Sequence, residues 1–109
     1  MFYLGIDIGK NTHVASLVDD KKKVIFKAFS FSNSIDGAES LILKLEAFKN
    51  ELEVGMEATG HYWLSLYSFL IDLGFSCIVI VFISLAYLTE FHSYFPLSLL
   101  NSTPVAKIN

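Results

Sequence analysis

Two acidic residues share a local pattern that suits them to hold a metal ion. Asp7 follows Gly5 in "GID", and Glu57 follows Gly55 in "GME". Side chains alternate along a strand, so each glycine lies on the same face as its acid and leaves room for a ligand. A carboxylate buried among apolar neighbours is costly without a positive partner. We therefore expect such a partner beside Asp7.

The pair of acids predicts a particular chemistry if their two strands are neighbours. Two adjacent carboxylates repel each other unless a cation joins them. Mg²⁺ (or Mn²⁺) binds carboxylate oxygens and keeps water or phosphate as further ligands. A second ion would complete the two-metal arrangement for in-line displacement at phosphate. The alternative is structural: Asp7 ends a strand, where it could cap a turn or meet the nearby Lys10.

The elements that must position these acids follow from hydrophobic periodicity. Three strands joined by short polar turns are expected first, and the third is expected to alternate strictly between its two faces. A helix, a strand, a second helix and a buried strand follow. The expected segments are 2–8, 12–18, 24–31, 32–50, 51–60, 59–74 and 75–82, with the helical apolar stripes running from Ile35 to Phe48 and from Tyr62 to Leu73. The order β-β-β-α-β-α-β predicts an α/β fold with a mixed sheet, strand order 3-2-1-4-5 and two helices packed on it.

Composition narrows the class of protein. The net charge is −3, which is not typical of a basic nucleic-acid surface. The single cysteine, Cys77, excludes an internal disulfide, and the start of the chain lacks a signal-peptide pattern, so a cytoplasmic location is expected. The apolar run from Cys77 to Leu88 is too short to span a membrane, so no membrane partner is expected.

Three segments resemble a known family. The stretches "GIDIGKNTHVASLVD", "FSNSIDGAESL" and "VGMEATGHYWLSLYSFLIDLGF" are similar to the N-terminal part of the DEDD-type transposases of bacterial insertion sequences. The similarity runs from Tyr3 to Ile80, and "MEATGHYW" is its most specific part. It implies an RNase H-like, RuvC-like catalytic domain.

The resemblance also implies functional residues. Asp7 and Glu57 correspond to the first and second catalytic acids of the family, which would bind Mg²⁺ or Mn²⁺. Lys10, Thr59 and His61 lie next to them and are candidate contacts to nucleic acid. The implied activity is metal-dependent DNA strand cleavage and exchange, with DNA and a structured guide RNA as partners.

The chain departs from the family pattern after Ile80. No Asn-Pro turn and no D-x-x-D motif follow, and Glu90 has nothing to recommend it as a substitute acid. We therefore expect an incomplete RNase H-like domain at residues 1–80 and a divergent apolar tail at 81–109. The tail should be loosely attached, and the truncated chain should be inactive alone.

Two alternatives remain open. The segment "GIDIGKNTHVASLVD" also resembles the first phosphate loop of actin- and sugar-kinase-like ATPases, so the chain could be a fragment of one. It could instead be a non-catalytic remnant that associates with an intact transposase. Metal-dependent DNA binding without ATP binding would separate the transposase from the ATPase.

Overall fold

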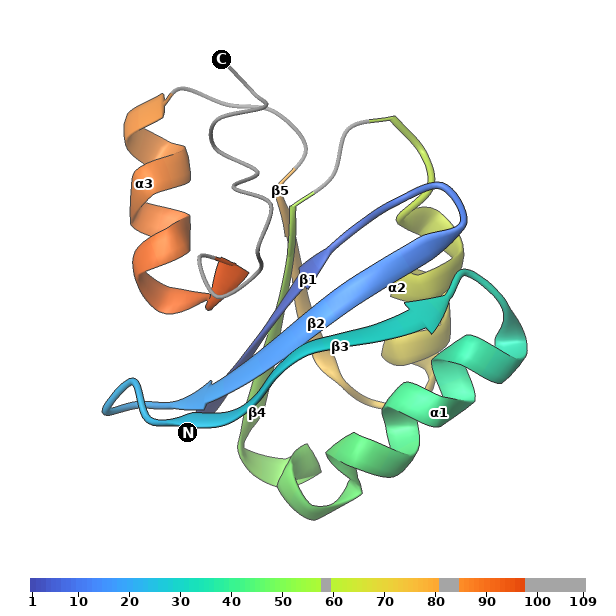
Figure 1. Cartoon of the computed structure of the whole chain (residues 1–109), viewed down its shortest axis with the longest axis horizontal. Coiled ribbons are helices and arrows are strands. Elements are labelled where there is room, and N and C mark those ends of the chain that lie inside the picture. The colour runs from blue at the N-terminus through green and yellow to red at the C-terminus, as the bar shows by residue number, and fades with distance from the viewer. Residues whose placement is uncertain (58–59, 81–84, 98–109) are drawn as a thin grey trace.

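A five-stranded mixed sheet lies at the centre of the computed structural model, which describes residues 1–57, 60–80 and 85–97 (Figure 1). Its strands are β1 (Phe2–Asp7), β2 (Thr12–Asp19), β3 (Val24–Ser32), β4 (Leu52–Glu57) and β5 (Ser76–Ile80). The spatial order is β3-β2-β1-β4-β5, with β1, β2 and β3 antiparallel and β4 and β5 parallel to β1. The predicted α/β class and strand order are confirmed.

Two helices and a 3₁₀ turn cover one face of the sheet. They are α1 (Ile35–Leu45), η1 (Glu46–Glu51) and α2 (Leu64–Asp72). Helix α1 begins where predicted, because the Ser34 hydroxyl accepts a hydrogen bond of 3.1 Å from the amide of Gly37. A cluster of fourteen buried side chains fills the space beneath these helices: Leu4, Ile6, Ala15, Leu17, Phe31, Ala38, Leu41, Leu45, Leu52, Val54, Met56, Leu66, Leu70 and Phe75. We call this set the large core.

Strand β3 does not alternate strictly, which corrects the prediction. Its register against β2 shifts, so that Phe29 pairs with Ala15 whereas Phe26 pairs with Leu17. Ala28 adopts a left-handed backbone with φ of 54°, and its amide donates a 2.9 Å hydrogen bond to the Ser16 hydroxyl. This bulge lets both Phe26 and Phe29 pack against the large core.

A third helix, α3 (Leu85–Tyr94), covers the opposite face of the sheet (Figure 1). A second cluster of buried side chains forms there, consisting of Ile80, Phe91, Phe95 and Leu97, with Tyr3 and Val14 packed against it. We call this set the small core. The expectation of a loosely attached tail is therefore wrong for residues 91–97, because their apolar side chains pack on the sheet.

A helix needs about 20 apolar residues to cross a lipid bilayer. Within residues 1–57, 60–80 and 85–97, no helix is long and apolar enough to cross a membrane.

Candidate metal site

Asp7 and Glu57 end two adjacent parallel strands at the same edge of the sheet. The register pairs Asp7 with Glu57 and, two residues earlier, Gly5 with Gly55. Strand alternation then places both acids on the face that carries α3, opposite the buried Ile6 and Met56. The prediction that the acids lie on neighbouring strands and share a face is confirmed. Their role in metal binding stays a prediction.

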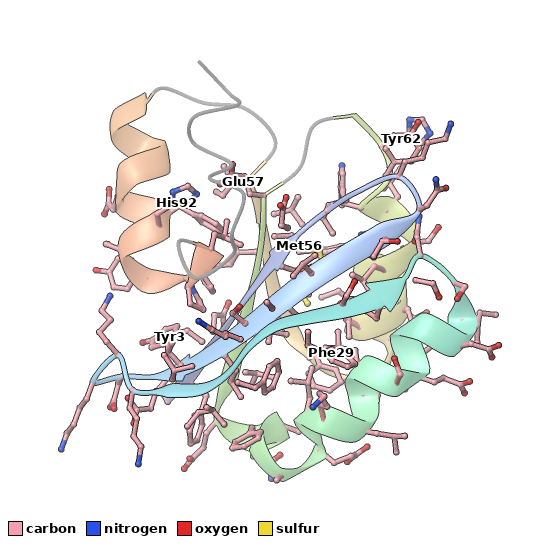
Figure 2. All side chains as sticks on the ribbon, viewed as in Figure 1. Tyr3, Phe29, Met56, Glu57, Tyr62 and His92 are labelled. Atoms are coloured by element: carbon pink, nitrogen blue, oxygen red, sulfur yellow. The ribbon has the colours of Figure 1, made fainter. Side chains whose placement is uncertain are left out.

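Glu57 has a partner that the sequence analysis did not identify. Nε2 of His92, on α3, donates to the Glu57 carboxylate (Figure 2). Glu57 is only 7% exposed and His92 12% exposed, so the contact is largely shielded from water. A buried carboxylate is stabilised by a charge-assisted hydrogen bond of this kind. His92 is therefore the hydrogen-bond donor that the buried carboxylate of Glu57 needs.

The space beside the two glycines is filled by residues that follow α3. A Cβ atom at Gly55 would overlap the ring of Phe95, and one at Gly5 would lie 3.1 Å from both Leu97 Cδ2 and Pro96 Cδ. The glycines therefore permit a close approach, as predicted. In this structure, however, the group that approaches is the chain's own C-terminal segment.

The other predicted site residues are spread around the same edge. Lys10 follows β1, His61 follows β4, and both are exposed. The His61 ring lies 4.6 Å from the Tyr62 ring, between centroids. Thr59 lies outside the described residues.

Two further titratable groups are perturbed by burial. Burial lowers the pKa of His13 from its usual 6.5, against smaller raising effects from Asn33 and the Asp7 carboxylate. Its Nδ1 accepts a 3.2 Å hydrogen bond from the Gly9 amide. Burial, with a smaller effect from Glu53, raises the pKa of the Cys77 thiol to about 12. A thiol with so high a pKa carries little thiolate at neutral pH, so Cys77 is a poor nucleophile.

The residues present fit a divalent cation only in part. Asp7 and Glu57 provide the hard oxygen ligands that Mg²⁺ and Mn²⁺ prefer. Across the described ranges, however, no three His, Cys, Asp or Glu side chains are grouped so that they could hold a metal ion. Asp7 and Glu57 therefore offer only two side chains of the kind that such an ion binds, and His92 engages one of them.

The strand order, the mixed sheet and the acids at the ends of its central parallel strands define an RNase H-like domain. A family model described as a transposase, DEDD_Tnp_IS110, matches residues 4–93. The chain therefore belongs to the DEDD transposases of the IS110 type. The match extends beyond residue 80 into α3.

Solved structures are similar to this chain at low sequence identity. Pelota from Archaeoglobus fulgidus is 14% identical, with a TM-score of 0.51, over 84% of this chain and 30% of its own. A Ppx/GppA phosphatase from Aquifex aeolicus is 18% identical, with a TM-score of 0.40, over 74% of this chain and 36% of its own. The chain thus spans about a third of either structure. No curated protein matches it.

Proposed function

We propose that this chain carries the first half of a metal-dependent DNA strand-transfer site, formed by Asp7 and Glu57. The observation that supports this most is the register of β1 and β4, which pairs the two acids at one sheet edge in a transposase chain. The partner implied by the family is DNA. A guide RNA is proposed as a further partner on the strength of the resemblance.

The two carboxylates would hold a single Mg²⁺ or Mn²⁺ ion, which would supply electrostatic stabilisation at a DNA phosphate. The protein's own contribution is to fix both acids on rigid neighbouring strands. Four apolar side chains on the reverse of these strands are fully buried, namely Leu4, Ile6, Val54 and Met56. Their packing restrains the backbone beneath the acids.

Lys10 and His61 are proposed to contact nucleic acid beside this edge. Both are exposed, and they follow the two strands that end in acids. A lysine near a backbone phosphate adds a salt-dependent contact that does not read sequence. The net charge of −3 does not favour binding to a polyanion, so the chain's own DNA affinity should be low.

We further propose that the chain alone does not cleave DNA. In-line displacement at phosphate in a two-metal site needs more ligands than Asp7 and Glu57 supply. Removing part of a unit that acts together usually abolishes most of the rate rather than a proportional share.

The test measures Mn²⁺ binding and DNA cleavage on the same purified protein. We expect weak Mn²⁺ binding, seen by electron paramagnetic resonance, that is lost in Asp7→Asn and Glu57→Gln. Lys27→Gln, far from the sheet edge in sequence, is the control and should bind as the wild type does. No cleavage is expected. Binding that survives both acid substitutions would contradict the site, and cleavage that both abolish would show that the chain is an active nuclease.

A further inference from the structure

We propose that residues 92–97 close the acid-bearing face of the sheet and keep metal ions and nucleic acid away from Asp7 and Glu57. We call this segment the plug. The inference rests on the proposed function, because it concerns the regulation of that same site. Displacement of the plug would open the site without dismantling the fold.

The first argument concerns the ligand atoms of Glu57. A metal ion must take lone pairs of this carboxylate, and the Nε2 proton of His92 occupies one of its oxygens. Both side chains are largely buried, so water competes weakly for this hydrogen bond. His92 and a cation therefore compete for the Glu57 carboxylate.

The second argument concerns access to the sheet. The ring of Phe95 lies directly over Gly55, and Pro96 and Leu97 lie over Gly5. Phe95 is 5% exposed and Leu97 is fully buried. Any substrate that approached the backbone beside the acids would have to displace these side chains, because they already touch it.

The third argument concerns what holds the plug in place. Among the side chains that the structure describes, the small core has four buried members and the large core has fourteen, and the two lie on opposite sides of the sheet. A ring contact with Tyr3, at 5.9 Å between centroids, and a hydrogen bond from Lys22 Nζ to the Ser93 carbonyl add to the attachment. These contacts can break while the large core stays packed, so the plug can move as a unit.

The test compares Mn²⁺ affinity in the full chain and in variants of the plug. His92→Ala and Phe95→Ala should each raise Mn²⁺ affinity about tenfold, the change expected when a competing charge-assisted hydrogen bond or a covering side chain is removed. Leu43→Ala is the control: it removes an apolar side chain that is 79% exposed, on helix α1 at the other face of the sheet, and it should leave the affinity unchanged. His92→Asn guards against misfolding of the alanine variant.

A second measurement reports on the plug directly. Amide hydrogen exchange of residues 91–97 should become faster in the wild type when Mn²⁺ is added, because the ion replaces His92 at Glu57. Slower exchange with Mn²⁺, or a lower affinity in His92→Ala, would show that His92 is a metal ligand and would overturn the plug.

The outcomes also separate the plug from the proposed function. If the wild type binds Mn²⁺ through Glu57 and the plug variants bind no better, the plug alone is wrong. If neither the wild type nor any plug variant shows Mn²⁺ binding that Glu57→Gln abolishes, the proposed metal site is wrong. The plug proposal, which rests on that site, is then refuted as well.

Discussion

The Glu57 carboxylate shows how one buried charge is compensated. Hydrogen bonds to charged groups contribute about 1.5–3 kcal/mol, and leaving such a group unpaired costs more. His92 provides this compensation from a helix 35 residues further along the chain. The Glu57 carboxylate can therefore stay buried without a metal ion, because His92 of the plug is its partner.

The pattern of glycine and acid was enough to predict where Asp7 and Glu57 would lie, because alternation and parallel pairing fix a strand residue's face and neighbours. His92 could not be found in this way. Its contact with Glu57 depends on how α3 docks, and only the spacing of Phe91 and Phe95 on either side of it indicates a buried helical face.

His13 should make stability depend on pH. Its pKa is lowered in the folded chain, so below the unfolded value of 6.5 the unfolded chain binds the proton more readily. The free energy of unfolding should therefore be highest above pH 6.5 and fall as the pH is lowered through it. Urea unfolding between pH 7.5 and 5.5 would measure this slope.

Two variants test the assignment to His13. His13→Gln should flatten the slope in this range, even if it lowers stability overall. The exposed His61 gives the control, since His61→Gln should keep the slope. An unchanged slope in His13→Gln would mean that another group is responsible.

At the scale of elements, the bulge in β3 stores backbone strain at one residue. A non-glycine residue in the left-handed region costs about 1–2 kcal/mol, and Ala28 has φ of 54° there. Ala28→Gly should therefore raise the free energy of unfolding, by up to about 1 kcal/mol after the entropy of glycine is counted. Ala28→Val should lower it, and chemical denaturation measures both. Destabilisation by glycine would show that the bulge carries no strain.

Most elements followed from the sequence, and the exceptions have physical causes. The hairpins, α1 and the buried strands have strong periodicity and clear turn residues. The bulge was missed because alternation of apolar residues in "VIFKAFSF" suits two registers, and only packing against α1 selects one. Helix α3 was missed because its apolar residues do not form a regular stripe, so tertiary contacts decide its structure.

At the scale of the molecule, the sheet separates two unequal layers, and deleting residues 81–109 tests their independence. The deletion removes Phe91, Phe95 and Leu97 from the small core. The apolar burial that is lost outweighs the conformational entropy that no longer has to be given up to order this segment. The free energy of unfolding should therefore fall by roughly 1–3 kcal/mol. Urea unfolding should remain a single cooperative transition because the large core is intact.

Solubility should fall in this deletion. The deletion bares an apolar face of the sheet that includes Tyr3, Val14 and Ile80. Light scattering of the truncated and full chains at equal concentration would measure the difference. A truncated chain that is unfolded would show that the large core depends on the small one.

The distribution of the large core along the chain has a consequence for biosynthesis. All of its members lie between Leu4 and Phe75. The N-terminal part of a chain emerges first from the ribosome and begins to fold there. The sheet can therefore assemble around β1 and β4 while the plug is still being translated, so a nascent chain passes through a stage in which Glu57 has not yet met His92.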